Sequence, residues 1–415
     1  MKKTLFLFTF LIVVLSDDAH SNENIPLQHF FCDSAMTSGS LSPDGKYFAS
    51  MVPASGAKCA IEEIDDPQAA RVLLVIDLET NKPTVLSGTK GKSRLTGFTW
   101  ISNTRIAFFR QPEAGLDAYS MWAINVDGTK PKELVPGKWE DSYPTGARLL
   151  DRMKDDENHV LVSYNKRRPK YTDVYKLNIF SGKLTMVAKD PVIDGQTSLG
   201  WAVDQQGLVR GYVAVKGLYT YLYHRNDADS DFELLRKFKF QEASFGPAAY
   251  SYDPRYVYMR GQAVAADGTV IDDSDTDALW LYDAYEDKFV EKIYENDRYD
   301  VGGIAISTKT EEPAYIAYYG EKPEKIWIDE DLEQVYATIE ASFPNDQVSI
   351  GGWTEDEDKA IITTWSDTNP GEMYYYDRNK GTIAFIAKSR PWINKDEMSP
   401  MLPISFTARD GLVVN

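Results

Sequence analysis

Short apolar runs recur along this chain, and one kind of run always ends in Asp or Asn followed by a polar turn. The run "LLVIDLETNK" is typical, and it has six counterparts. The residues that end the seven runs are Asp77, Asn125, Asn178, Asn226, Asp283, Asp329 and Asp377. Successive copies lie 46 to 57 residues apart, with a mean of 50. Because their apolar residues alternate or run continuously, the pattern predicts strands rather than helices.

A second series of strands precedes the first in the same order. Each of its members lies 13 to 29 residues ahead of its partner. The second series is centred on Phe48, Ala107, Leu161, Val213, Val257, Ile316 and Ile362. Turn-forming residues separate the strands, as at Asp127-Gly128 and Lys380-Gly381.

A unit of about 50 residues with several short strands is typical of a β-propeller blade. Tandem β-sandwiches are the competing architecture, but they would not give seven equal units with one internal order. We therefore predict an all-β fold, a seven-bladed β-propeller over residues 41–393. Residues 22–40 are expected to lead into it.

Two acidic insertions separate the two strand series in the first and fifth units. They span residues 53–68 and 263–278. Since both fall at the same hairpin of their units, we expect both on one strongly acidic face of the disc.

The N-terminus has the pattern of a signal peptide. Lys2 and Lys3 precede eleven apolar or Thr residues, 5–15, which are too few to span a bilayer as a helix. A buried helix is the alternative, and the leading lysines disfavour it. We expect residues 1–21 to be removed and the mature chain to be exported to a bacterial periplasm or beyond, without stable membrane insertion.

The chain has two cysteines, Cys32 and Cys59, and both follow the predicted leader. In an oxidising compartment they could form a disulfide that closes a loop of about 28 residues. Two buried free thiols are the alternative, and the sequence leaves both open. No lipobox precedes Cys32, so a lipid anchor is not expected.

The net charge of −18 argues against nucleic acid as a partner, because binding to phosphates relies on Lys and Arg. The run Asp273-x-Asp275-x-Asp277 is similar to a calcium loop, but Ala278 replaces its turn glycine and Ala284 its closing Glu. We therefore predict no metal and no cofactor. The basic stretch 165–170 is expected to be a solvated turn.

Catalytic residues are not predicted within this chain. No G-x-S-x-G string occurs, and the mature chain has three histidines, His29, His159 and His224. A Ser-His-Asp triad is therefore not expected, and no pair of carboxylates stands out among 63 acidic residues. The aromatic stretch 373–376 is better explained by packing between blades than by a binding platform. Binding residues stay unknown.

The last residues, "RPWINKDEMSPMLPISFTARDGL" (390–412), resemble a junction found in serine peptidases of the prolyl oligopeptidase family. The similarity is greatest to acylaminoacyl-peptidase-like and dipeptidyl-aminopeptidase-like members. There, a Pro-Trp pair such as Pro391-Trp392 closes the last blade, a Met/Pro-rich linker such as 398–403 follows, and an A-R-D-G turn begins the α/β-hydrolase domain. Here, a strand over 404–408, a turn at 409–411 and a strand from Leu412 are predicted. The stretches 25–31, 40–51 and 151–165 also resemble that family.

The resemblance implies that residues 394–415 are a linker and the start of a missing α/β-hydrolase domain. The catalytic Ser, Asp and His would lie in that domain, so none is assigned here. The propeller of this family restricts entry to short peptides. The first hypothesis is therefore a non-catalytic, substrate-gating propeller of an exported peptidase, truncated or split before its catalytic domain. Its partners would be peptides or a separately encoded α/β-hydrolase half. The alternative is a stand-alone periplasmic scaffold that binds peptide or protein.

Overall fold

The computed structural model describes residues 25–54, 56, 59, 71–88, 93–111, 118–140, 143–191, 193, 195–240, 244–272 and 274–414. The predicted leader and most of the first acidic insertion lie outside these residues. Within the part that is described, no helix is both long and apolar enough to cross a membrane.

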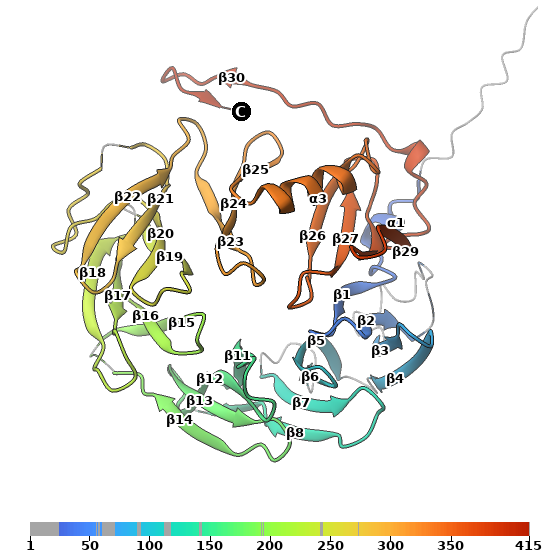
Figure 1. The fold of residues 1–415 in the computed structure, drawn as a ribbon, viewed down its shortest axis with the longest axis horizontal. Helices are drawn as coiled ribbons and strands as arrows, with labels where there is room; N and C mark the ends of the chain where they lie inside the picture. The colour runs from blue at the N-terminus through green and yellow to red at the C-terminus, as the bar shows by residue number, and fades with distance from the viewer. Residues whose placement is uncertain are drawn as a thin grey trace, which may run out of the picture.

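Seven antiparallel sheets stand side by side in a ring, so the predicted seven-bladed propeller is confirmed (Figure 1). Six blades have four strands, and the sixth has three strands followed by a helix. The first three blades comprise β1 (Thr37–Leu41), β2 (Tyr47–Pro53), β3 (Arg71–Asp77) and β4 (Lys82–Gly88); β5 (Arg94–Ser102), β6 (Arg105–Gln111), β7 (Ser120–Asn125) and β8 (Lys132–Val135); β11 (Ala147–Asp151), β12 (His159–Arg168), β13 (Tyr171–Asn178) and β14 (Leu184–Ala188).

The other four blades continue the same order along the chain. They comprise β15 (Thr197–Val203), β16 (Val209–Lys216), β17 (Tyr219–His224) and β18 (Glu233–Lys239); β19 (Phe245–Tyr250), β20 (Tyr256–Gly261), β21 (Ala278–Asp283) and β22 (Lys288–Tyr294); β23 (Val301–Ile306), β24 (Pro313–Tyr319), β25 (Pro323–Trp327) and α3 (Glu330–Glu340); β26 (Gln347–Gly351), β27 (Lys359–Trp365), β28 (Glu372–Asp377) and β29 (Thr382–Lys388). The first strand of each blade lies nearest the centre of the ring, and the chain then runs outward (Figure 1).

The hydrophobic core lies between the blades. Each of the seven junctions has its own cluster of buried side chains. At the junction of the fifth and sixth blades, for example, Leu279 packs with Val301 and Ile316, all at most 2% exposed. Burying one such side chain contributes about 1.5–3 kcal/mol, so seven junctions of this kind stabilise the ring strongly.

The ring closes by packing and single hydrogen bonds. In the described part of the chain, no sheet combines strands of the first and last blades. Instead, Leu41 and Phe48 of the first blade pack against Ile361 of the seventh. The N–H of Ala35 donates to the carbonyl of Ser389 at 2.7 Å. The two ends of the propeller are thus held by contacts that do not depend on a shared strand.

The repeated Asp or Asn has a structural role at the end of the third strand. The Oδ1 atom of Asp77 accepts hydrogen bonds from the N–H groups of Glu79 and Thr80, at 3.0 and 2.9 Å. Asn178 and Asp283 make the equivalent bonds in their blades. Such Asx turns favour the tight connection to the fourth strand, which explains why Asp or Asn ends these strands.

In the sixth blade the same side-chain geometry begins a helix, which the sequence analysis did not predict. Asp329 is the N-cap of α3, and its Oδ1 accepts from the N–H groups of Asp331 and Leu332. The helix buries Leu332, Tyr336 and Ile339 against the seventh blade. It therefore takes the place of a fourth strand.

The propeller begins earlier than expected. Strand β1 (Thr37–Leu41) begins within residues 22–40, which were predicted to be a lead-in segment. Its sequence, TSGSL, contains Gly and Ser and only one buried residue, Leu41. A strand without an apolar face gives no signal in a pattern analysis.

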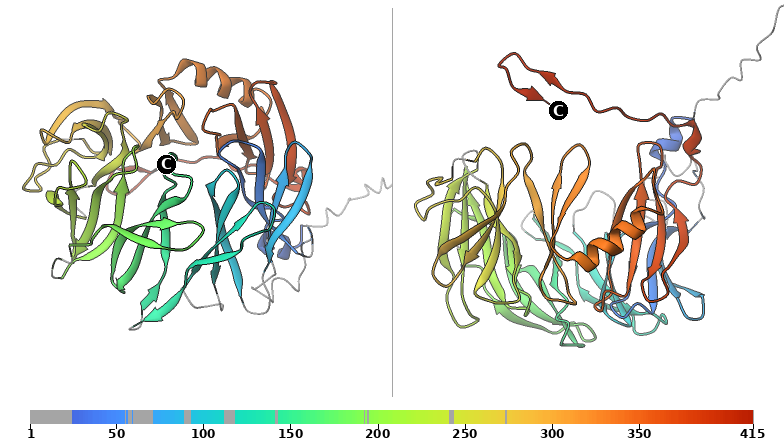
Figure 2. Two further views of the ribbon diagram at one scale, coloured as in Figure 1. Left: turned by 60° about the horizontal axis from the view of Figure 1, so that its bottom comes forward. Right: turned by 45° about the horizontal axis from the view of Figure 1, so that its top comes forward.

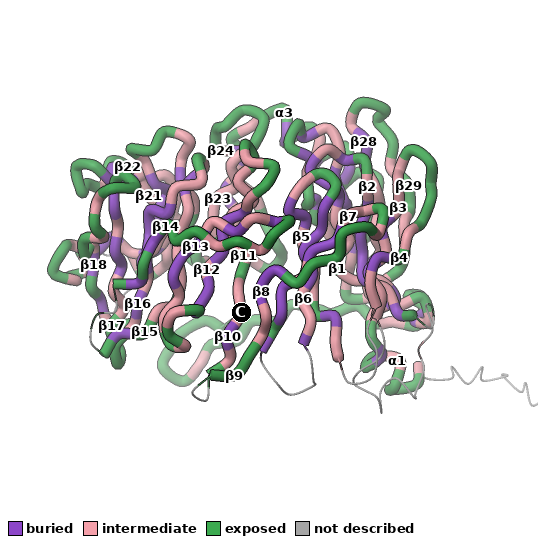
Figure 3. The backbone as a smooth tube through the Cα atoms, turned by 90° about the horizontal axis from the view of Figure 1, so that it is seen from below, coloured by how far each residue is buried: buried purple, intermediate pink, exposed green. Residues whose placement is uncertain are grey.

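Several additions lie on one face of the disc. Helix α1 (Gln28–Phe31), the hairpin of β9 (Lys138–Glu140) and β10 (Tyr143–Thr145), and the C-terminus are all at the lower rim in Figure 3. After the 3-10 helix η1 (Lys395–Glu397), the chain leaves the ring and ends in the hairpin of β30 (Phe406–Thr407) and β31 (Val413–Val414), which stands clear of the disc (Figure 2). The predicted C-terminal turn is present, since the N–H of Gly411 bonds to the carbonyl of Ala408.

The two acidic insertions both connect the second and third strands of their blades. The described part of the second insertion folds against β18 of the fourth blade, where Arg236 Nε donates to the carbonyl of Val264 at 2.7 Å. An added Cβ at Gly268 would meet the carbonyl oxygen of Lys237 at 2.2 Å. This stretch therefore covers the flank of a blade rather than standing free above the disc.

Candidate binding site inside the ring

The innermost strands are open toward the centre of the ring. Five of them carry a glycine at which an added Cβ would meet no atom within 4 Å. These glycines are Gly97, Gly200, Gly246, Gly303 and Gly351. These positions of the inner strands therefore face space rather than a packed neighbour, and two cavities adjoin them.

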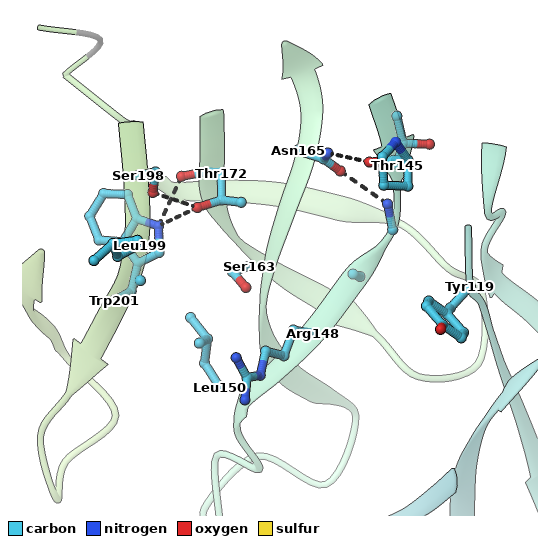
Figure 4. A pocket seen from close by; sticks show the side chains of 14 residues that line it. Tyr119, Thr145, Arg148, Leu150, Ser163, Asn165, Thr172, Ser198, Leu199 and Trp201 are labelled. Atoms are coloured by element: carbon cyan, nitrogen blue, oxygen red, sulfur yellow. Dashed lines mark hydrogen bonds between the residues drawn. The ribbon is translucent and has the colours of Figure 1, made fainter. Parts of the chain in front are cut away.

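The first cavity, of about 570 Å³, lies between the inner strands of the third and fourth blades (Figure 4). Its walls come from the start of β11, from β12 and β13, and from the start of β15. Because β11 follows directly after β10, the cavity is close to the face that carries the β9–β10 hairpin. Its volume is in the range of pockets that bind small molecules and short peptides.

One end of the first cavity is held by a fully bonded Asn165. Its Nδ2 donates to the carbonyls of Pro144 and Pro169, at 2.9 and 2.8 Å, and its Oδ1 accepts from the N–H of Gly146 at 3.0 Å. These bonds fix the β10–β11 connection against the β12–β13 turn. Asn165 is therefore a positioning residue.

The opposite wall is held by Trp201. Its Nε1 donates to the carbonyl of Thr172 at 2.8 Å, and the hydroxyls of Thr172 and Ser198 lie 3.0 Å apart. Leu199 is 61% exposed on the same wall. This wall thus presents an apolar surface to the cavity. The Nε1 atom of Trp201 and the hydroxyls of Thr172 and Ser198 already have hydrogen-bond partners.

Between these walls stand Arg148 and Ser163, directly opposite each other on β11 and β12. Figure 4 shows both side chains in the cavity, next to Leu150. Among the described residues neither side chain has a hydrogen bond or ion pair. Of the residues that the structure describes, Arg148 is also the only charged one that lines the cavity. The two side chains offer a cation and a hydroxyl to a ligand.

A second cavity of about 570 Å³ lies near the inner strands of the fifth and sixth blades and the outer strands β17 and β18 of the fourth. Its lining includes Arg260, but this guanidinium pairs with Asp277 at 2.9 Å. Phe240, 75% exposed, contributes an apolar edge. The cation of the second cavity is thus neutralised, unlike that of the first.

The histidines do not assemble a hydrolytic site. His159 Nδ1 lies 2.9 Å from Asp156 Oδ1, and His224 Nε2 lies 3.2 Å from a nitrogen of Arg210. Burial, and next the positive charge of Arg210, lower the pKa of His224 to about 4. In the part of the chain that the structure describes, no histidine side chain is hydrogen-bonded to a serine or cysteine.

The residues that the sequence analysis discussed as metal or aromatic sites have other partners. Asp277 pairs with Arg260, Asp273 lies outside the described residues, and no group of three metal-ligating side chains occurs among those that are described. In the aromatic stretch, Tyr374 packs against Phe343 with ring centroids 4.8 Å apart. Packing within and beside the blade accounts for it.

The basic stretch 165–170 is not simply a solvated turn. Arg167 makes a bidentate pair with the buried Asp173, at 2.9 and 2.7 Å. Lys170 lies over the ring of Tyr143, 5.0 Å from its centroid. The stretch therefore ties the β12–β13 hairpin to its surroundings, including the β9–β10 hairpin.

Cys32 and Cys59 are joined as a disulfide, with their Cα atoms 5.5 Å apart. The bond links the segment that carries α1 to the first acidic insertion. The N-terminal segment is also tied to the end of the ring, since Trp392 Nε1 donates to the carbonyl of His29 at 2.9 Å.

Comparison with known proteins agrees with this architecture. The chain is 24% identical over 391 residues to dipeptidyl aminopeptidase BIII of Pseudoxanthomonas mexicana, covering 89% of this chain and 49% of the relative. It is 20% identical over 415 residues to dipeptidyl peptidase family member 6 of Caenorhabditis elegans, covering 97% and 52%. It resembles the propeller part of prolyl oligopeptidase-family peptidases. No family model matches the chain.

The chain spans about half the length of the curated relatives it matches. Among solved structures, a prolyl endopeptidase is 14% identical with a TM-score of 0.57, covering 93% of this chain and 54% of that one. Prolyl oligopeptidase B of Galerina marginata is 10% identical with a TM-score of 0.55, covering 93% and 56%. These structures support the propeller fold, and the predicted resemblance is confirmed.

Proposed function

We propose that these residues are the substrate-gating, non-catalytic propeller of an exported serine peptidase of the prolyl oligopeptidase type. The catalytic Ser, His and Asp would come from an α/β-hydrolase unit that lies outside these residues. The observation that carries the proposal is an open-centred ring, similar to half of a dipeptidyl aminopeptidase, whose C-terminal segment exposes apolar side chains.

The C-terminal segment, defined as residues 398–414, is suited to contact a second unit. Met401, Leu402 and Ile404 are 78%, 80% and 77% exposed, and Phe406 and Leu412 are exposed as well. Several exposed apolar side chains within one segment are typical of a surface that another unit covers. Free strand edges at β30 and β31 also offer backbone groups for pairing with a sheet. The occupant that fits both features is the sheet of a hydrolase unit.

The first cavity supports gating. Its volume of about 570 Å³ suits a short extended peptide rather than a folded protein. If the hydrolase unit covers the face from which the C-terminal segment leaves, substrates that enter through the ring are limited to short peptides. Export agrees with the leader and with the Cys32–Cys59 disulfide, since disulfides persist in oxidising compartments.

The test uses the purified chain with dipeptidyl and acyl-aminoacyl p-nitroanilides. We expect the chain alone to give no turnover that a serine-directed inhibitor abolishes. Added to the α/β-hydrolase unit encoded at the same locus, it should restrict cleavage to short peptides. Inhibitor-sensitive turnover by the chain alone, or unrestricted cleavage by the complex, would contradict the proposal.

A matched pair of variants tests the docking surface. Leu402→Asp should weaken association with the hydrolase unit, because it places a charge in the apolar segment. Val85→Asp is the control, since Val85 is 62% exposed on the outer strand β4. Equal affinities of the two variants in analytical ultracentrifugation would exclude the C-terminal segment as the contact.

The alternative is a stand-alone scaffold that binds peptide or protein. One observation favours it: each of the seven junctions has its own buried cluster, so the ring can be stable without a second unit. A gene after codon 415 that is unrelated to hydrolases would favour the scaffold. A following sequence with G-x-S-x-G would favour the peptidase.

A further inference from the structure

We infer that the first cavity contains a carboxylate-binding subsite, in which Arg148 and Ser163 hold the carboxylate of a short peptide. The inference rests on the proposed function, because it names the chemistry by which the ring would select its peptides. It assigns a ligand-binding role to two residues that the sequence analysis did not single out.

The first argument is geometric. Arg148 and Ser163 are directly opposite each other in the β11–β12 ladder, so their Cβ atoms are within about 5.5 Å. Both side chains line the same cavity (Figure 4). A guanidinium presents a planar fork of donors that matches the two oxygens of a carboxylate, and a neighbouring hydroxyl can donate a further hydrogen bond.

The second argument is the local charge. The whole chain carries 63 acidic and 45 basic residues, yet the lining of this cavity, as far as its residues are described, contains Arg148 and no Asp or Glu. Among the described residues Arg148 has no ion-pair partner, whereas Arg260 of the second cavity is paired with Asp277. A free cation in a cavity without acidic groups favours an anionic ligand.

The third argument concerns the rest of the ligand. Leu150 beside Arg148, and Leu199 and Trp201 on the opposite wall, supply apolar surface in the same cavity, where the side chain next to the carboxylate can pack. Among the described strands, β11 pairs only with β12, so its inner edge is free to bond to an extended peptide backbone. A single guanidinium beside an apolar wall suits a peptide carboxylate better than a highly charged phosphate ester.

The experiment measures binding of Gly-Gly-Phe to the whole chain by isothermal titration calorimetry at fixed ionic strength. Three probes are compared: the free acid, its C-terminal amide, and Gly-Glu-Phe-amide, which carries a side-chain carboxylate only. They are tested on the wild type, Arg148→Met, Ser163→Ala and Arg298→Met. The last variant is the control, because Arg298 is exposed and does not line the cavity, while the net charge changes equally.

We expect Arg148→Met to weaken binding of the carboxylate peptide at least about tenfold, Ser163→Ala to weaken it less, and Arg298→Met to leave it unchanged. The amide should bind weakly to all four proteins. Tight binding by the free acid alone assigns the subsite to a terminal carboxylate, and tight binding by Gly-Glu-Phe-amide assigns it to an acidic side chain.

Two results would overturn the inference, and they are distinguishable. The first result is that the free acid and the C-terminal amide of Gly-Gly-Phe bind equally well and that Arg148→Met does not change their affinity. The ring then binds peptides without this subsite, and the proposed function stands. If no peptide binds the wild type at all, both the subsite and peptide gating are wrong. Circular dichroism of each variant verifies that the propeller is folded.

Discussion

His224, at the end of β17, is a neutral histidine enclosed by the fourth and fifth blades. Its ring is stacked on that of Tyr250, with centroids 6.4 Å apart, and its Nε2 lies 3.2 Å from Arg210. Burial and the adjacent guanidinium lower its pKa to about 4, against which a hydrogen bond with Asn226 and the charge of Asp287 act more weakly. Acid should therefore destabilise this part of the ring.

The sign and size follow from linkage between protonation and folding. The pKa of His224 is lower in the folded chain than in the unfolded chain, where it is about 6.5. Below pH 6.5 the unfolded chain binds a proton that the folded chain does not. The free energy of unfolding therefore decreases as the pH is lowered from about 6.5 to about 4. Each pKa unit is worth about 1.4 kcal/mol, so the loss at pH 4.5 is about 2–3 kcal/mol.

The prediction is tested with His224→Gln, which keeps a neutral acceptor for Arg210. Urea unfolding at pH 7 and pH 4.5, followed by tryptophan fluorescence, should show a smaller acid-induced loss in this variant, by about 2–3 kcal/mol. His159→Gln is the control, since it removes a histidine paired with Asp156 and keeps His224. Parallel losses in the wild type and His224→Gln would refute the reasoning.

Three further predictions concern stability and the cavity. Asp204→Ala should cost about 3–5 kcal/mol in urea unfolding, because it leaves Arg210, with a fully buried side chain, without its carboxylate; a loss below about 1 kcal/mol would contradict this. Cys32→Ser should lower stability by about 3–4 kcal/mol through loss of the bond to Cys59, 27 residues away, and dithiothreitol should lower the Tm only of the wild type. Gly200→Val should leave the Tm nearly unchanged, since its Cβ meets open space, but should reduce peptide binding in calorimetry; unaltered binding would place the ligand elsewhere.

The parts of the fold that were predictable from sequence are the middle strands of each blade. Strands β2 and β3 are covered by neighbouring blades, so they carry the apolar runs that a pattern analysis detects. The Asp or Asn after the third strand marks the turn that follows, as Asp77 does. The middle strands are buried on both faces and a turn follows the third strand of each blade. The sequence therefore shows the same pattern at intervals of about 50 residues.

The helix α3 and the binding residues were not predictable in the same way. Asp329 ends an apolar run, as do the residues that begin an Asx turn in the other blades. A helix N-cap uses the same hydrogen bonds from backbone N–H groups to the Asp side chain, so the sequence does not distinguish the two structures. Arg148 is one cation in the short stretch ARLLD, and its place beside Ser163 depends on strand pairing and on which residues face the centre. Such a juxtaposition has no linear motif.

The inner strands explain why a ring of this kind can carry a site without losing stability. Since the core lies between blades, residues of the inner strands that face the centre contribute little packing. Gly200 and Gly303 are therefore tolerated in the middle of strands, although glycine there normally destabilises. The inner strands β11 and β15 also have irregular pairing registers. It follows that ligand binding should be tested at charged or small residues of the first strand of each blade, which precedes the two apolar middle strands. Arg148 is the first of these positions.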